Sequence, residues 1–252
     1  AIGVSSQPLP GDRLQLVNGG DISPVAPYEL VERIRASINV LGPLLGRYGR
    51  VDLSLPGGDD FGSRPIDMHL KGLEAMGAVF ELSHGVVHGH ADRLHGADIT
   101  LDFPSVGATE NLVTAAVHAK GTTVVDNAAR EPEIADLCEF LVSMGADIEG
   151  IGSSRVVVHG VQPGSLRAAS HRVVPDRIQA ATYLAAAAVS GGEVVLRDVR
   201  PAHMDMLLRR LRSRLAAELP SLVEATLNAA VAGLTADLRQ GIDETTRAAI
   251  DD

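Results

Sequence analysis

The 252-residue sequence is poor in cysteine and in positive charge, and each shortage argues against a class of protein. Cys138 is the only cysteine, so neither a disulfide framework nor a cysteine-rich zinc site is available, and a reducing compartment fits. Lysine and arginine total 22 against 32 acidic residues, which disfavours nucleic acids and anionic membranes as partners. An anionic ligand would therefore need a local basic pocket.

Long apolar runs are also missing, although apolar residues are plentiful. Hydrophobic residues make up 45% of the chain and its mean hydropathy is +0.13, which suits one large core or two modest ones. No run reaches membrane length, and the first residues lack the charged start and apolar centre of a signal peptide. We therefore expect a globular, cytoplasmic protein. A chain that begins with Ala1 is also expected to be a processed or partial product.

A unit of roughly seventy residues recurs three times along the chain. In each copy a helix leads through a glycine into a strand, and the strands are expected at 51–55, 122–125 and 193–196. A second helix with proline near its start is expected after each strand, at 65–76, 132–144 and 201–214. Short alternating strands follow the first two copies, at 79–82, 85–88, 147–149 and 155–158. Gly77 and Gly145 are predicted to be left-handed helix caps.

These repeats predict an α/β fold, namely an incomplete inside-out α/β barrel of αβαββ units, with helices inside and sheets outside. The helices are too apolar to face water; residues 182–189, apolar nearly all round, should be buried. The repeat fades after about 210, and residues 211–252 are predicted to form an α-helical C-terminal tail. That tail is expected to cover apolar surface or to make a homo-oligomer contact, and it carries no recognisable chemistry.

The loop at 56–65 combines glycines, a carboxylate and an arginine. Gly57, Gly58 and Gly62 allow positive φ and close ligand approach, while Arg64 offers a planar fork for carboxylate or phosphate. Asp59 on this hinge suits proton chemistry beside an anionic substrate. The alternative is a polar turn between a strand and a helix.

Six segments together are more specific than any one motif: Arg33–Ile38, Leu55–Gly58, Gly62–His69, Ser105–Thr109, Asn127–Glu133 and Val174–Ile178. With them the chain resembles, over about residues 12–210, the UDP-N-acetylglucosamine 1-carboxyvinyltransferase family of enolpyruvyl transferases. The resemblance implies two inside-out domains of three repeats each. Residues 1–173 would be most of the first domain, 174–210 the start of the second, and 211–252 the helical tail.

The resemblance implies transfer of the enolpyruvyl group from phosphoenolpyruvate to the 3′-hydroxyl of UDP-N-acetylglucosamine with release of phosphate, without metal or organic cofactor. Asp59 stands where many members carry a cysteine proton donor. Asp60 and a substrate carboxylate would raise the pKa of Asp59, whereas Arg64 would lower it. A carboxylate is a weaker nucleophile than a thiolate, so we expect resistance to epoxide inhibitors such as fosfomycin. Asp59 could also be a plain turn residue.

The resemblance also implies a set of substrate-binding residues. Arg35 and Arg64 would contact anionic groups, and a Pro-Ile-Asp-Met-His segment would line the uridine side. A loop before a helix would present backbone N–H groups to the diphosphate. The residues of the two segments are Pro65, Ile66, Asp67, Met68, His69, Phe103, Pro104, Ser105, Val106 and Gly107. The alternatives are solvated or ion-paired arginines, an ordinary histidine and a plain N-cap at Ser105.

Some family features have no match here. The family's Lys-Asn pair for phosphoenolpyruvate and its aspartate base do not appear in residues 1–20 or 211–252. Glu131, Glu133, Asp176 and Arg177 resemble residues near the family's cleft, although a structural ion pair is as good an interpretation. A catalytically inactive remnant that binds a nucleotide sugar or a protein partner therefore stays open, as does an enolpyruvyl transferase with another acceptor.

Overall fold

The computed structural model describes residues 2–20, 22–55, 57, 65–205 and 209. The chain separates into two compact units, residues 1–174 and 175–252. Among the described residues no helix is long and apolar enough to cross a membrane.

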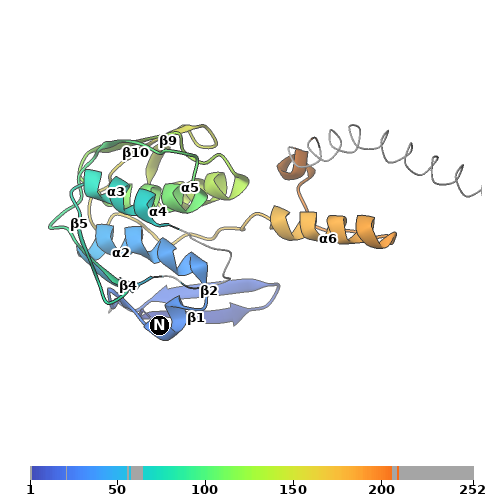
Figure 1. Ribbon diagram of the computed structural model, residues 1–252, viewed down its shortest axis with the longest axis horizontal. Coiled ribbons are helices and arrows are strands. Elements are labelled where there is room, and N and C mark those ends of the chain that lie inside the picture. Colours follow the sequence, from blue (N-terminus) through green and yellow to red (C-terminus); the bar gives the residue numbers. More distant parts are fainter. Residues whose placement is uncertain (1, 21, 56, 58–64, 206–208, 210–252) are drawn as a thin grey trace, which may run out of the picture. The chain divides into compact units, whose positions relative to one another are not determined.

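The first unit contains two four-stranded mixed sheets with the same strand order. Figure 1 shows the two sheets on opposite sides of a layer of helices. In the first sheet the order is β3-β4-β6-β5, and in the second it is β7-β8-β10-β9. In both, the first two strands run parallel and the remaining neighbours antiparallel. The strands are β3 (Val25–Ala26), β4 (Arg50–Ser54), β5 (Val79–Ser83), β6 (Val86–His90), β7 (Asp98–Thr100), β8 (Thr122–Asp126), β9 (Asp147–Glu149) and β10 (Arg155–His159). The two-fold recurrence confirms the repeat in its first two copies.

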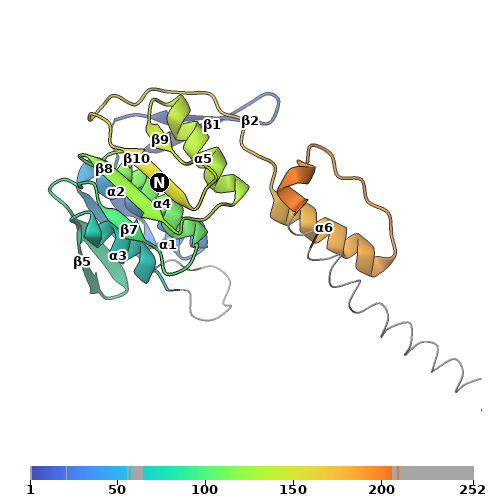
Figure 2. The ribbon, with the colours of Figure 1, turned by 90° about the horizontal axis from the view of Figure 1, so that it is seen from above.

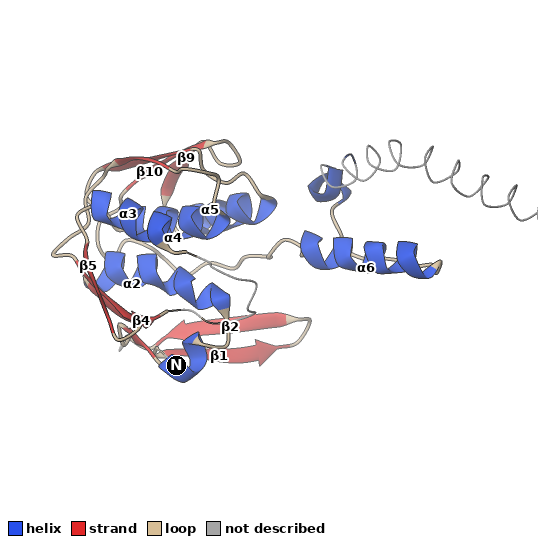
Figure 3. Ribbon diagram, in the orientation of Figure 1, coloured by secondary structure: helices blue, strands red, loops and turns tan. Residues whose placement is uncertain are grey.

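Helices lie between the two sheets of this unit (Figure 3). They are α1 (Tyr28–Val31), the 3-10 helix η1 (Arg35–Val40), α2 (Leu41–Tyr48), α3 (Asp67–Ala75), α4 (Val106–Ala116) and α5 (Pro132–Ser143). The α4 helix is central: it packs against α2, α3 and α5 and buries seven of its eleven residues. A Cβ placed on Gly42 in α2 would overlap the Asn111 carbonyl of α4, so glycine is required for this approach.

The sheets bury one face and expose the other, as alternating strands should. In β4, Val51 and Leu53 are fully buried against the helices. Between them, Asp52 points outward and accepts hydrogen bonds from Arg50 at 2.6 Å and from the ring of His88 at 2.6 Å. This ion pairing, with the apolar inner face, fixes which way the strand faces.

A third hairpin, β1 (Val4–Leu9) paired with β2 (Arg13–Asn18), was missed in the sequence. The signal was present: Leu14 and Leu16 alternate with polar residues, and Gly11 with Asp12 forms a turn with positive φ at both positions. Both faces of this hairpin are exposed. Gly77 and Gly145, in contrast, end their helices with positive φ as predicted.

The second unit departs from two expectations. Its α6 helix (Arg177–Ser190) forms where predicted, but Ala180 is its only buried residue and Val189 is 90% exposed. Residues 193–196 form no strand, and Val195 is 75% exposed. The expected burial and the expected strand are both wrong here, because the described residues of this unit offer neither a sheet nor a pairing strand. A 3-10 helix, η2 (Pro201–Met204), follows, while the predicted tail helices lie outside the described residues.

Candidate functional site

The N-terminal ends of η1, α3 and α4 meet within the first unit, and we call this region the helix-end cluster (Arg35, Asn39, Pro65–His69, Ser105–Asn111). The Arg35 guanidinium, at the start of η1, donates to the Pro65 carbonyl just before α3 at 3.4 Å. In α3, the ring Nδ1 of His69 lies 2.8 Å from the Asn111 side-chain nitrogen of α4. Residues 30 and 42 positions apart in the chain are thereby brought together. Figure 2 shows α3 and α4 as neighbours from a second direction.

Two further contacts extend the cluster toward the start of α5. The Asn39 amide donates a short hydrogen bond to the Glu110 carboxylate, which joins η1 to α4. The Thr109 hydroxyl accepts a hydrogen bond from the Ala129 backbone N–H at 3.0 Å, which joins α4 to the loop before α5. Glu133, in the first turn of α5, acts electrostatically on Glu110. Four helix starts therefore lie on the same side of the helical layer.

His69 is held neutral at physiological pH. Its side chain is almost fully buried, with the residue 5% exposed. Burial, and to a lesser extent the positive charge of Arg35, lower the pKa of the imidazole to about 4, against a smaller opposing effect of Asp67. The sequence interpretation of an ordinary, partly exposed histidine is therefore wrong.

The pKa of Glu110 shifts in the opposite direction from that of His69. Burial raises the pKa of its carboxyl and the charge of Glu133 raises it too, while the hydrogen bond from Asn39 lowers it. This carboxyl is therefore closer to protonation at neutral pH than an exposed glutamate.

In the first turn of α4 one backbone N–H group is capped by a side chain, and others have no partner within the helix. The Ser105 hydroxyl accepts a hydrogen bond from the Ala108 N–H at 3.3 Å, so the plain N-cap interpretation of Ser105 holds. The first N–H groups of a helix have no carbonyl within the helix to bond, which leaves those of Val106 and Gly107 for a ligand. Phe103, 56% exposed, and Pro104 lead into this turn at the surface.

Other predicted residues are not among those of the helix-end cluster. Asp59 and Arg64 lie outside the described residues. At the near end of their loop, the Gly57 N–H donates to the Val31 carbonyl at 3.3 Å, and a Cβ there would overlap the Glu32 carbonyl. Glycine at 57 therefore serves close backbone approach, not positive φ. Asp176 caps α6 in the second unit by accepting from the Ile178 N–H at 2.8 Å.

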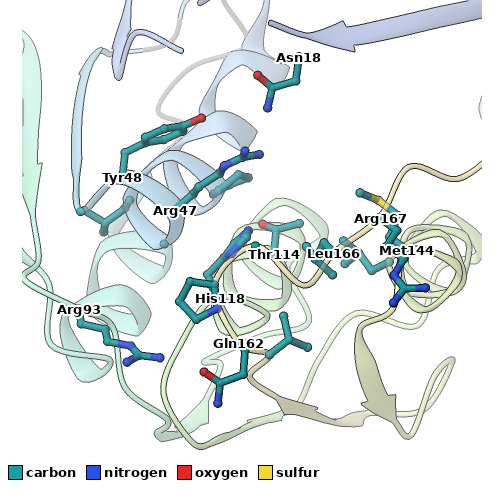
Figure 4. A pocket seen from close by; sticks show the side chains of 18 of the residues that line it. Asn18, Arg47, Tyr48, Arg93, Thr114, His118, Met144, Gln162, Leu166 and Arg167 are labelled. Carbon is teal, nitrogen blue, oxygen red and sulfur yellow. The ribbon is translucent and has the colours of Figure 1, made fainter. Parts of the chain in front are cut away.

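A large open pocket of about 1480 Å³ lies at the opposite ends of the same helices. It is lined by the last residues of α2, by Thr114 and His118 after the middle of α4, by the end of α5 and by the β2 strand (Figure 4). Arg47, Arg93 and Arg167 make it basic, and burial together with Arg47 lowers the pKa of His118. The pocket contains none of the predicted substrate-binding residues. Arg35, Pro65–His69 and Ser105–Gly107 lie in the helix-end cluster and not in this pocket.

Comparison with known proteins identifies the family. A family model described as EPSP synthase (3-phosphoshikimate 1-carboxyvinyltransferase) matches residues 3–249. The chain belongs to this family of enolpyruvyl transferases. A curated relative, UDP-N-acetylglucosamine 1-carboxyvinyltransferase of Solidesulfovibrio magneticus, is 47% identical over 237 residues, which cover 94% of this chain and 55% of the relative. The chain thus spans about half the length of that relative.

Solved structures agree on the fold. The enolpyruvyl transferase NikO of Streptomyces tendae aligns with a TM-score of 0.63 and 27% identity, over 73% of this chain and 44% of that protein. EPSP synthase of Acinetobacter baumannii aligns with a TM-score of 0.56 and 23% identity, over 79% of this chain and 45% of that protein. At this identity the second match shows the fold alone.

Sequence reasoning missed Asn39, Glu110 and Asn111, three polar members of the cluster. A signal for two of them exists: Glu110 and Asn111 interrupt a helix whose other inward residues, apart from Thr109, are apolar, and Asn111 is completely buried. A polar residue inside an apolar helix needs hydrogen-bond partners, which is a reason to look for a site around it.

Proposed function

We propose that this chain carries most of one substrate-binding domain of an enolpyruvyl transferase that acts on UDP-N-acetylglucosamine and phosphoenolpyruvate, in the synthesis of peptidoglycan in the cytoplasm. The observation that carries this proposal is the convergence of Arg35, Pro65–His69 and Ser105–Gly107 at one set of helix ends. Those segments come from the first two copies of the repeat, and they are the ones in which the sequence resembles the nucleotide-sugar enzymes. The 47% identical relative bears the name of that activity.

The proposed reaction is an addition followed by an elimination. The 3′-hydroxyl oxygen of the sugar forms a bond to C2 of phosphoenolpyruvate, loses its proton to a base, and C3 gains a proton. Phosphate then leaves C2 while C3 loses a proton, which regenerates the double bond in the enolpyruvyl ether. We assign the proton donation at C3 to Asp59, whose carboxyl must remain partly protonated near neutral pH to act.

The binding roles follow from chemistry at the helix ends. Arg35 and Arg64 supply charge-assisted hydrogen bonds to anionic substrate groups. The N–H groups of Val106 and Gly107 and the positive end of α4 suit the diphosphate. Pro65, Ile66, Asp67, Met68 and His69 line the uridine side, with Phe103 and Pro104 at the rim. No residue of this chain is assigned as the base for the sugar hydroxyl.

The finer fold features belong to the same proposal. The two sheets with helices between them would be two faces of the inside-out α/β barrel, with 1–173 as the first domain and 174–210 as the start of the second. The residues 211–252 would form a helical tail that serves a homo-oligomer contact.

The test is phosphate release from phosphoenolpyruvate that depends on UDP-N-acetylglucosamine. We expect the unmodified chain to release phosphate, Asp59→Asn to lose release, and the neighbouring Asp60→Asn to retain it as a matched control. Loss in both variants would remove Asp59 from its role. Binding of UDP-N-acetylglucosamine by a folded chain without any phosphate release would favour the inactive remnant instead. Release with shikimate 3-phosphate as the preferred acceptor would favour the other acceptor class.

A further inference from the structure

Asn111 is completely buried, and two backbone groups fix how its side-chain amide is oriented. The Gly42 N–H of α2 donates to Oδ1 at 2.7 Å, and Nδ2 donates to the Ile38 carbonyl of η1 at 3.1 Å. A backbone N–H can only donate and a carbonyl can only accept. If the oxygen and nitrogen of this amide were exchanged, a donor would face the donor N–H of Gly42 and an acceptor would face the acceptor carbonyl of Ile38. Both mismatches would lie in the core.

The fixed amide determines the tautomer of His69. Nδ2 of Asn111 is necessarily a donor, and the ring nitrogen it faces at 2.8 Å is Nδ1 of His69. A neutral imidazole accepts through its unprotonated nitrogen and donates through the other. The proton of His69 therefore resides on Nε2.

The Nε2 edge of the ring faces the first turn of α4. A Cβ built on Gly107 would lie 3.2 Å from Cε1 and 3.6 Å from Nε2 of His69. Within the described part of the chain Nε2 has no hydrogen-bond partner. The charged groups that act on the ring are Arg35 from η1 and Asp67 from its own helix. Arg35 opposes a second proton on the ring, and this is consistent with a neutral donor.

We propose that Asn111 is a positioning residue that holds His69 as the Nε2–H tautomer, so that the ring offers a fixed, uncharged hydrogen-bond donor to an acceptor oxygen bound at the start of α4. The identity of that ligand, a nucleoside diphosphate sugar, rests on the proposed function, whereas the tautomer does not. The arrangement adds a directional donor beside the α4 N–H groups without adding positive charge.

The tautomer can be measured directly by long-range proton–nitrogen NMR on the ligand-free, nitrogen-15-labelled chain. His69 is assigned among the nine histidines by the signal that His69→Gln removes. We expect an unprotonated Nδ1 and a protonated Nε2 from pH 8 down to pH 5. A proton on Nδ1, or a doubly protonated ring at pH 7, in the unmodified chain would overturn the proposal without any variant.

Asn111→Asp tests the role of the amide. Aspartate presents only acceptor oxygens to the ring, so the proton should move to Nδ1 or the ring should become doubly protonated near pH 7. Unchanged signals of the exposed His88 and His90 serve as the folding control in the same spectra. If the variant folds and His69 keeps its original tautomer, Asn111 does not set it.

A ligand-binding measurement distinguishes a failure of this inference from a failure of the proposed function. Glutamine can place an amide N–H near the position of Nε2, whereas asparagine, an amide that is one carbon shorter, cannot. With UDP-N-acetylglucosamine as the calorimetric probe, His69→Gln should bind within about threefold of the unmodified chain and His69→Asn about tenfold more weakly. Equal binding by all three would overturn the donor role. No binding by the unmodified chain would count against the proposed function and leave the tautomer to the NMR measurement.

Discussion

The second and third copies of the repeat begin with equally good helix signals, yet only the second is built into a core. The α4 helix is capped by Ser105 and buries most of its residues, whereas α6 is capped by Asp176 and buries only Ala180. After α4, residues 122–126 pair with two strands; after α6, residues 193–196 remain without pairing in the described chain. Local sequence thus specifies where a helix begins and ends, while burial and strand formation depend on partners elsewhere in the chain.

The largest expected effect is loss of packing in the second copy. Leu112 is fully buried in α4 and contacts the Gly72 region of α3, so Leu112→Ala should lower the free energy of unfolding by about 2–5 kcal/mol. Ile178 is an exposed position near the start of α6, and Ile178→Ala should change it by less than about 0.5 kcal/mol. Urea unfolding followed by circular dichroism gives both values. Equal losses would mean that α6 is as well packed in solution as α4.

The second prediction concerns pH, because His69 is neutral only while the first two copies stay packed around it. Its pKa is about 4 in the folded chain against an ordinary 6.5, so the unfolded chain binds more protons between these values. Stability from this group is complete above about pH 6.5 and is lost as pH falls toward 4, by on the order of 3 kcal/mol.

The measurement is the free energy of unfolding at a series of pH values between 7 and 4 for the unmodified chain and for His69→Gln. Because other groups titrate in both proteins, the difference between the two curves isolates the histidine. We expect the variant to have the shallower decline. Parallel curves would show that His69 titrates normally and is not buried in solution.

The helices and the hairpins of the first two copies could be predicted from sequence because their signals are local: proline at a helix start, glycine after Met76 and Met144, and alternation in short strands. The parallel partners β3 and β7 were not predicted, because a strand of two or three residues has almost no periodicity of its own. Their positions are set by β4 and β8, which lie elsewhere in the chain.

In the candidate site, too, some residues could be found from the sequence and others depend on long-range contacts. Arg35, His69 and Ser105 were found through a family resemblance, and the structure brings their helix ends together. Asn111 was not found, because its importance lies in three contacts with η1, α2 and α3, at positions about seventy residues away for two of them and forty-two for the third. Local sequence cannot give a tautomer that depends on such contacts.

The smallest effect separates local from long-range stabilisation most cleanly. Ser105 and Asp176 both accept hydrogen bonds from the first turn of their helices, so Ser105→Ala and Asp176→Ala should each cost their helix about 1 kcal/mol. In α4 that cost should appear in global unfolding, since the helix is part of the core. In α6 it should appear instead as faster amide hydrogen exchange confined to residues 177–190, with little change in the unfolding of the first unit. If Asp176→Ala lowered the global stability as much as Ser105→Ala, then α6 would unfold together with the core. The two copies would then not differ in how their first helices are stabilised.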